Sequence, residues 1–347
     1  MPTVYIMGAG ATKAVCKQAP LTENLLDDAF KKYPNNNRIQ EVKQFIQDLF
    51  QITDRLLSKG SSGWPRIEDI LSHLDIAIQE QRPFSNDYPL RKLEDLRYNV
   101  IYLIYKILND SLKDLDNEAT YKFVRKISED STIISLNYDI VVDNALLGLR
   151  WDKYGNRFRH VNYGCKIRGL IDWNGFHLEP NYDNLCFPIP LCKLHGSLNW
   201  LYCPTCSAID LTEEEKGVYY IFDHKEVETC SYCGTKYEPL IITPTMVKRY
   251  DNSLLVQIWR YVEQAIRGAD KLVFIGYSLP DSDSHIKYLI NRGLALNQHA
   301  KDASLKIEVV TRLGAPNEKS DVIERYHKFF GNGIIYKPVG FENYLVW

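Results

Sequence analysis

The stretch TVYIMGAGAT, residues 3–12, opens the chain and decides its fold. Five strand-forming residues lead directly into a glycine-containing turn, after which a helical turn is expected. Glycines at such a turn let the backbone approach a pyrophosphate, whose charge is attracted by free N–H groups and the helix dipole. The third glycine of the usual dinucleotide fingerprint is missing. The fragment alone therefore fits a plain strand-to-helix turn equally well.

Three later segments repeat the arrangement of an apolar run that stops at polar residues or glycine. They are TIISLNYD at 132–139, LHGS at 194–197 and KLVFIGYSL at 271–279. In an open α/β sheet the ligand-binding loops follow the carboxyl ends of the strands. The sequence therefore predicts an α/β fold, a Rossmann-like doubly wound parallel sheet with these loops at one edge.

The chain between the first two strands predicts a different structure. Residues 22–129 carry helical apolar stripes and almost no strand-like alternation, which indicates a large helical insert. Beyond it, Ser253 to Gly268 is expected to be a helix, with a polar start and a glycine stop. Further strands are expected where β-branched runs return, at 240–243, 272–275, 307–311 and 333–336. We expect one domain over 1–347, holding the insert and a small module at 198–238.

Composition narrows the class of protein. The 347 residues carry a formal net charge of −2 and are 45% hydrophobic, as is ordinary for a soluble globular protein. The sequence has no run of lysine or arginine that would indicate direct nucleic-acid binding. It also has no apolar stretch long enough to span a bilayer. The first apolar run lacks a basic leader and is interpreted as a strand. With eight cysteines, this favours a reducing compartment, the cytoplasm.

Two Cys-x-x-Cys pairs form the most specific motif that can be recognised without any family. Cys203 and Cys206 make the first pair, and Cys230 and Cys233 the second. Two such turns deliver four thiolates to one tetrahedral centre, and Gly234 permits the tight turn that such sites use. The alternatives are a redox dithiol or unrelated free thiols. A centre with four protein ligands has no open position, so the predicted zinc is structural.

Three polar side chains at the predicted sheet edge are candidates for chemistry. Asn137 could hold a ribose hydroxyl or orient a water, and the Asp139 carboxylate could favour positive charge on a sugar. The alternative is that both residues cap the helix expected to begin near Asp139. His195 is followed by a flexible glycine, and its ordinary pKa near neutrality suits a general base. A hydrogen-bonded loop histidine is its alternative.

The four segments that begin at residues 3, 132, 194 and 271 occur in this order, with the paired cysteines between the third and the fourth. In this arrangement the chain resembles the Sir2 (sirtuin-like) NAD-consuming family. The resemblance implies that Asn137 and Asp139 match the family's Gln-Asn-x-Asp motif, in which Leu136 replaces the Gln, and that His195 is the base of its His-Gly pair. It also implies an NAD-binding set of residues. These are Gly8, Ala9, Gly10, Ala11, Thr12, Gly276, Tyr277, Ser278 and Thr311.

The resemblance implies an activity as well. Residues 12–16 (TKAVC) replace the family's Gly-Ile-Pro-Asp-Phe-Arg stretch, whose Phe and Arg belong to the deacylase pocket. Residues 67–72 (IEDILS) resemble a stretch common in the bacterial anti-phage defence branch, whose members hydrolyse NAD to nicotinamide and ADP-ribose. We therefore expect an NAD glycohydrolase. The alternatives are an NAD-dependent protein deacylase and a non-catalytic NAD or ADP-ribose sensor.

Regulation is expected to come from assembly or from a partner protein. An NADase that is always active would deplete its own host, so a barrier must keep the site inactive at rest. We expect a homo-oligomer, with a separate activating subunit such as a neighbouring ATPase or sensor protein as a further route. NAD, as substrate, and structural zinc are the expected ligands.

Overall fold

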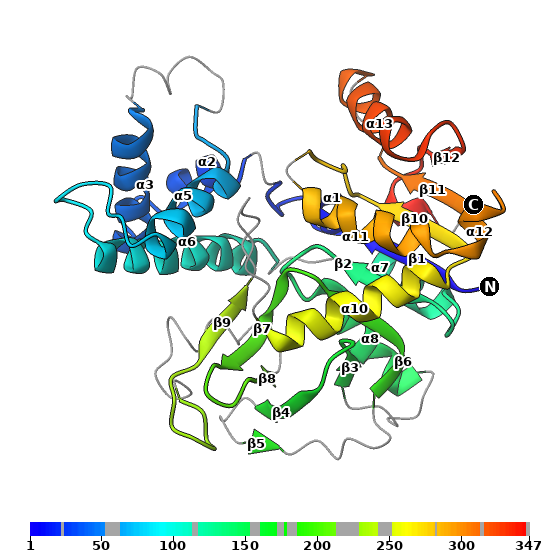
Figure 1. Ribbon diagram of the computed structural model, residues 1–347, viewed down its shortest axis with the longest axis horizontal. Coiled ribbons are helices and arrows are strands. Elements are labelled where there is room, and N and C mark those ends of the chain that lie inside the picture. The colour runs from blue at the N-terminus through cyan, green and yellow to red at the C-terminus, as the bar shows by residue number, and fades with distance from the viewer. Residues whose placement is uncertain are drawn as a thin grey trace. The chain divides into compact units, whose positions relative to one another are not determined.

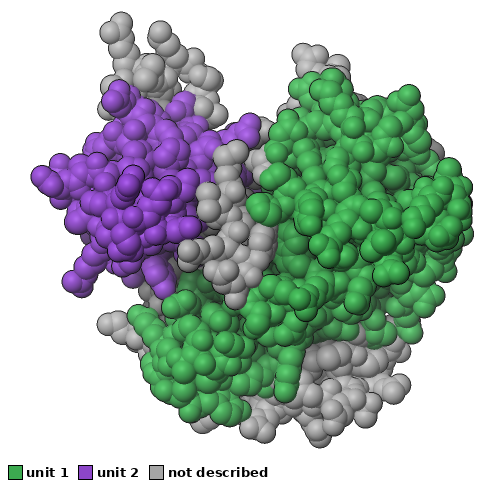
Figure 2. Space-filling model, viewed as in Figure 1, with its two compact units in different colours: residues 1–17, 115–240, 250–347 green, residues 18–114, 241–249 purple. Residues whose placement is uncertain are grey.

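The computed structural model describes residues 1–21, 24–52, 63–112, 117–152, 160–171, 177–178, 186–212, 229–241, 252–281, 283–312 and 316–344. The chain divides into two compact units, coloured separately in Figure 2. The first unit comprises residues 1–17, 115–240 and 250–347, and the second comprises residues 18–114 and 241–249.

A seven-stranded sheet forms the centre of the first unit. Its order is β12-β11-β10-β1-β2-β6-β3, and every neighbouring pair is parallel. The strands are β1 (Thr3–Met7), β2 (Thr132–Ser135), β3 (His160–Asn162), β6 (Cys186–Lys193), β10 (Lys271–Ile275), β11 (Lys306–Val310) and β12 (Ile334–Lys337). Without the edge strand β3, the strand order is that of the doubly wound dinucleotide-binding folds, and it reverses between β1 and β10. The predicted fold class is confirmed.

Helices cover both faces of this sheet, as right-handed crossovers require when the strand order reverses. Helix α7 packs against α8, and α10 packs against α11 (Figure 1). Tyr5 on β1 meets Phe123 of α7 edge-on at 5.0 Å, whereas Phe274 on β10 meets Tyr326 of α13 at 5.2 Å. Because Tyr5 is aligned with the residue before Phe274, these two rings point to opposite faces. The helices are α1 (Ala9–Val15), α7 (Glu118–Lys126), α8 (Val141–Asp152), α10 (Ser253–Arg267), α11 (Ser284–Ala295), α12 (Gln298–Lys301) and α13 (Pro316–Phe330), with the short 3-10 turn η3 (Phe341–Asn343).

Helix α10 confirms the boundaries predicted for residues 253–268. The Asn252 side chain accepts hydrogen bonds from the N–H groups of Leu254 and Leu255, and Gly268 caps the other end. One face of the helix is buried and apolar. Local capping chemistry and one apolar stripe therefore suffice to specify this element.

A second sheet carries the cysteines. It has five strands in the order β5-β4-β8-β7-β9. They are β4 (Ile167–Ile171), β5 (His177–Leu178), β7 (Gly196–Cys203), β8 (Ala208–Thr212) and β9 (Glu238–Ile241). β7 and β8 form an antiparallel hairpin, and β4 adds to β8 in parallel. Of the first cysteine pair, Cys203 is the last residue of β7 and Cys206 lies in the turn of this hairpin.

The second unit is helical in its described part, apart from an isolated bridge between Ser85 and Tyr88 and the last residue of β9, Ile241. Its helices are α2 (Leu25–Lys32), α3 (Asn37–Phe50), α5 (Ile67–Gln79) and α6 (Leu90–Ser111). The long helix α6 contacts the other three, and its apolar residues are buried among them. Helix α7, which closes the 22–129 stretch, instead contacts α8 and η3 in the first unit. Among the described helices, none has both the length and the apolarity needed to cross a membrane.

Candidate functional site

The loops after β1 and β10 touch backbone to backbone where the strand order reverses. The Gly8 N–H donates to the Ile275 carbonyl (3.0 Å), and the Gly10 N–H donates to the Gly276 carbonyl (2.8 Å). Gly276 has a φ of +59°, and a Cβ built on it would lie 2.2 Å from the Ala11 nitrogen. A Cβ on Gly8 or on Gly10 would lie 2.8 Å from the Gly276 oxygen. All three glycines are therefore required for the two loops to meet.

This contact also uses the amide hydrogens of the loop. Besides those of Gly8 and Gly10, the Ala11 N–H donates to Gly8 (2.9 Å) and the Gly276 N–H donates to Val310 (3.1 Å). The structure thus gives the glycine-rich turn a structural role of its own.

Asn137 and Thr12 link the loop after β2 to the loop after β1. The Asn137 side-chain amide donates to the Gly8 carbonyl and to the Thr12 hydroxyl, both at 3.0 Å. The Thr12 hydroxyl in turn donates to the Asp139 carboxylate at 2.7 Å. Asn137 remains half-buried, whereas Thr12 and Asp139 are buried. The hydroxyl, amide and carboxylate singled out from sequence therefore form one hydrogen-bonded group.

Asp139 also has the helix-capping geometry that was its alternative interpretation. Its second carboxylate oxygen accepts the N–H of Val141, the first residue of α8, at 3.1 Å. Burial raises the pKa of the Asp139 carboxyl, against the opposing effects of Lys193 and of the hydrogen bonds from Thr12 and Val141. Both oxygens are thus engaged inside the protein, so Asp139 can act through its charge and by fixing its loop.

A buried lysine lies behind Asp139. Lys193, the last residue of β6, is 0% exposed, and its ammonium donates to the Asp139 carbonyl. The same ammonium lies 3.3 Å from the carboxylate of Asp143, which is 1% exposed. The Tyr163 hydroxyl donates to the other oxygen of Asp143. A buried ammonium costs several kcal/mol unless it is paired, and these acceptors compensate for its burial.

The network continues onto β7. The Asn199 amide donates to the Tyr163 hydroxyl at 3.2 Å, and the Ser197 hydroxyl donates to Asn199 at 2.7 Å. Burial and the neighbouring Asp143 carboxylate raise the pKa of the Tyr163 hydroxyl, which keeps the phenol protonated. The sequence prediction did not include this network. A lysine inside the apolar run before His195 was its one local signal, because lysines are rarely buried without a partner.

His195 lies between β6 and β7, close to the Asn137 loop. Its Nδ1 is 3.2 Å from the Leu136 carbonyl, and its ring centroid is 6.1 Å from that of Tyr138. The Leu198 N–H donates to the Tyr138 carbonyl at 3.0 Å, so the two loops are also joined through their backbones. A proton on Nδ1 would donate to the Leu136 carbonyl and make Nε2 the basic nitrogen. The imidazole is only 5% exposed.

The remaining predicted binding residues lie after β10 and β11. The Tyr277 side chain is buried, and its hydroxyl donates to Asp283 at 2.9 Å. Ser278 is exposed, and its carbonyl accepts a hydrogen bond from Arg325 at 2.9 Å. The Thr311 hydroxyl lies 2.9 Å from the Tyr336 hydroxyl. Ser278 is thus an exposed polar residue of this loop, while Tyr277 and Thr311 also have roles within the fold.

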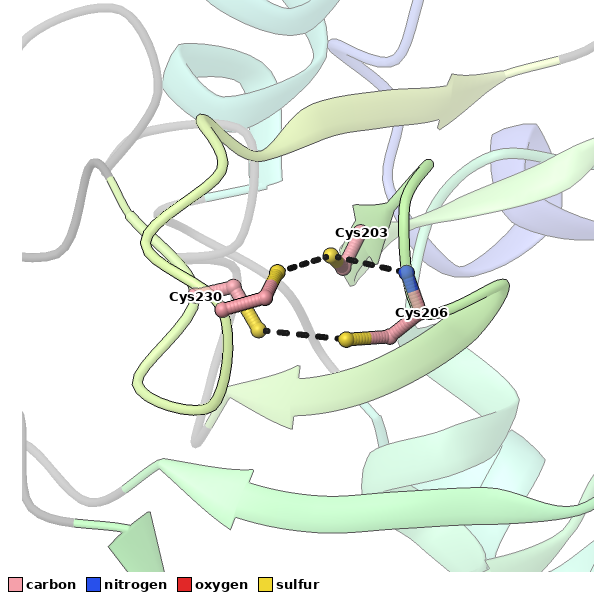
Figure 3. Close-up of side chains that lie close together, drawn as sticks. Cys203, Cys206 and Cys230 are labelled. Atoms are coloured by element: carbon pink, nitrogen blue, oxygen red, sulfur yellow. Dashed lines mark hydrogen bonds between the residues drawn. The ribbon is translucent and has the colours of Figure 1, made fainter.

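The four paired cysteines come together at the end of the second sheet. The Sγ atoms of Cys203 and Cys233 are 3.4 Å apart, those of Cys206 and Cys230 are 3.9 Å apart, and all four lie within 4.8 Å of one another. Figure 3 shows the labelled Cys203, Cys206 and Cys230 turned toward a common centre. Gly234 has a φ of +71° and donates its N–H to the Cys230 carbonyl, as the predicted tight turn requires.

These distances fit a zinc ion. A tetrahedral centre with Zn–S bonds of about 2.3 Å separates its sulfurs by about 3.8 Å. Cys203, Cys206, Cys230 and Cys233 are free thiols, so the cluster is not a pair of disulfides. The four thiols could therefore hold zinc.

Comparison with known proteins finds similarity in structure alone. No family model matches the sequence, and no curated protein matches it. A Sir2 homologue mutant in complex with 2'-O-acetyl ADP ribose is 12% identical, with a TM-score of 0.41 over 95% of this chain and 94% of that one. A Sir2 homologue mutant in complex with ADP ribose is 11% identical, with a TM-score of 0.39 over 99% and 88% of the two chains. A structure described under the mechanism and regulation of Sir2 enzymes is 13% identical, with a TM-score of 0.37 over 97% and 86%.

Proposed function

We propose that this protein is an NAD glycohydrolase that cleaves NAD to nicotinamide and ADP-ribose. One observation carries the proposal: the Asn137 amide and the Asp139 carboxylate are joined through Thr12 beside the point where the strand order reverses, and the His195 imidazole contacts the backbone of the loop that carries them. Ligands of doubly wound sheets bind at that point. The resemblance of the same residues to Sir2 motifs supports NAD as the ligand.

In the proposed reaction, NAD lies across the strand ends with its pyrophosphate at residues 8–12. The bond between ribose C1' and the nicotinamide nitrogen breaks, and its electron pair leaves with nicotinamide. A water then forms the new C1'–O bond, and its proton passes to His195. Asn137 positions the ribose and the water.

Asp139 contributes negative charge as the sugar becomes oxocarbenium-like. Because both of its oxygens already accept hydrogen bonds, it acts on the sugar through its field and through the shape of its loop. The Lys193 ammonium opposes the effect of burial and favours the ionised form of Asp139. The network behind the site would thus hold Asp139 in place.

Zinc, in this proposal, is structural. Bound by Cys203, Cys206, Cys230 and Cys233, it would tie the β7–β8 turn to the segment before β9 and contribute directly to folding free energy. We propose the cytoplasm as the protein's location, where reducing conditions would keep these four cysteines available as thiolates. Metal analysis should return about one zinc per chain, and Cys203→Ser should lower stability before activity. Isolation with these cysteines as disulfides would contradict the assignment.

We further propose that the enzyme is an NAD-depleting effector of anti-phage defence. The support is the stretch at residues 67–72, which forms the first turns of α5. Its apolar members Ile67, Ile70 and Leu71 are buried in the helical unit, so the resemblance includes core positions of that unit.

An NAD-dependent protein deacylase is the second candidate, because the cysteine cluster and His195 suit it equally well. Purified protein with NAD, with and without an acyl-lysine peptide, separates the two. We expect nicotinamide and ADP-ribose in equal amounts without peptide. Release that requires the peptide would make the protein a deacylase, and binding of NAD without turnover would make it a sensor.

A further inference from the structure

An arginine lies against the cysteine cluster without being one of its ligands. Arg168 is on β4, and its Nη2 donates to the Cys230 sulfur at 3.2 Å. Cys230 is 1% exposed, so this hydrogen bond is made on the protein side of the cluster. A hydrogen bond to a ligand sulfur influences both the orientation of the ligand and its strength as a donor.

The guanidinium is itself held from several directions. Asp210 on β8 accepts its Nε at 3.0 Å and also its Nη2, in a two-point contact. Asp210 is 0% exposed and accepts the Tyr237 hydroxyl at 2.6 Å. On the other side, the Tyr232 ring centroid lies 4.5 Å from the guanidinium carbon. Tyr232 belongs to the second cysteine pair, so Arg168 contacts that pair at two points.

Arg168 would offset negative charge at the cysteine cluster. Zinc with four thiolates carries a net charge of −2, and the buried Asp210 carboxylate beside it adds another negative charge. Arg168 brings a permanent positive charge to the same place, and a planar fork can bind a carboxylate and a sulfur at once. A lysine ammonium offers no such fork.

We propose that Arg168 is an outer-sphere partner of the zinc–thiolate centre, which orients the Cys230 thiolate and offsets the centre's negative charge. It therefore determines how tightly the zinc is held. This inference concerns the cysteine module and does not depend on NAD cleavage.

The competing explanation is that Arg168 serves only to neutralise Asp210. Arg168→Gln alone cannot separate the two, because it leaves the Asp210 carboxylate buried without its cation. The double variant Arg168→Gln/Asp210→Asn removes both charges and keeps two polar side chains in place. Arg168→Lys retains the charge but loses the fork. Arg292→Gln is the control, because Arg292 is an exposed arginine paired with Glu263 on another part of the unit.

The experiment measures zinc dissociation constants for the full-length chain by competition with a chromophoric zinc chelator. We expect the constant to rise about 10- to 100-fold in Arg168→Gln and in the double variant, less in Arg168→Lys, and not in Arg292→Gln. Wild-type affinity in the double variant would overturn the proposal, and so would a wild-type chain that binds no zinc.

Cobalt(II) substitution gives a second readout that a purely structural role would leave unchanged. A hydrogen bond to a thiolate withdraws electron density from the sulfur, so its loss should shift the sulfur-to-cobalt charge-transfer band to lower energy. We expect this shift in Arg168→Gln and in the double variant. An unchanged band in the folded double variant would overturn the proposal.

Discussion

At the residue scale, the candidate site is supported by a buried positive charge. The Lys193 ammonium is fully buried, and it is held by the Asp139 carbonyl and the Asp143 carboxylate. Asp139 and Asp143 lie on either side of the start of α8, while Lys193 ends β6. The ion pair thus fastens the loop that carries Asn137 to the strand that leads into His195.

Lys193→Met tests whether this ion pair stabilises the contact between the loop and the strand. The substitution should lower the free energy of unfolding by about 3–5 kcal/mol, because it leaves the buried Asp143 carboxylate without its cation. Urea unfolding followed by circular dichroism measures the loss. Lys193→Met/Asp143→Asn should recover a large part of it. If the single variant is as stable as the wild type, the ion pair has been misassigned.

The sequence predicted individual site residues but not the residues with which they form hydrogen bonds or ion pairs. Gly8, Asn137 and His195 were found because each follows an apolar strand. The Lys193–Asp143 pair joins residues 50 apart in sequence, and no local pattern encodes that meeting. Tyr277 likewise looked like a loop residue, yet its ring turns inward to Asp283. Partner choice is a tertiary property, which periodicity and capping do not report.

At the element scale, α10 and most strands of the seven-stranded sheet were predictable because their apolar runs and caps are local. The second sheet was not, apart from β9, which overlaps the strand expected at 240–243. Its strands β4 and β5 are short, and β4 is aligned with β8 across about 40 residues. The cysteine cluster was predicted in spite of this, since each pair is a local turn. The contact between the loops after β1 and β10 could not be predicted from the sequence either, although it explains why Gly8, Gly10 and Gly276 are needed.

Gly276→Ala and Gly331→Ala form a matched pair for this loop contact. Both glycines have a positive φ, but a Cβ on Gly276 would meet the Ala11 nitrogen at 2.2 Å, whereas a Cβ on Gly331 would meet nothing within 4 Å. Gly331→Ala should cost about 1 kcal/mol for backbone strain alone. Gly276→Ala should cost about 1–3 kcal/mol more, because the two loops must separate. Equal destabilisation in urea unfolding would show that the loops do not need this contact.

At the scale of the whole molecule, the helical unit is inserted into the crossover between β1 and β2. The chain leaves the first unit after residue 17 and re-enters it at residue 115. A doubly wound sheet needs no such insert to bind a dinucleotide. Several large apolar side chains on the insert are exposed, namely Ile76 (40%), Phe84 (38%) and Tyr98 (38%). We propose that this unit controls activity through assembly.

Assembly control predicts that turnover depends on protein concentration. The purified chain should be weakly active when dilute, and its specific activity should rise as it self-associates, because a symmetric contact buries the same patch on every copy. Light scattering and NAD turnover, measured over the same concentration series, follow both quantities. Ile76→Lys should weaken both together. A strict monomer with full activity at every concentration would contradict the prediction.

The most direct measurement of the central claim is NAD turnover by His195→Ala and Asn137→Ala beside the wild type. His327→Ala is the control, because His327 is a half-buried histidine on α13 whose ring nitrogen Nδ1 lies 3.2 Å from the nearby Gly331 carbonyl, away from the Asn137 loop. With folding checked by circular dichroism, the account predicts a loss of at least about a hundredfold for the base variant. It predicts a comparable loss for Asn137→Ala and wild-type rates for the control. Near-normal nicotinamide release by folded His195→Ala would contradict it.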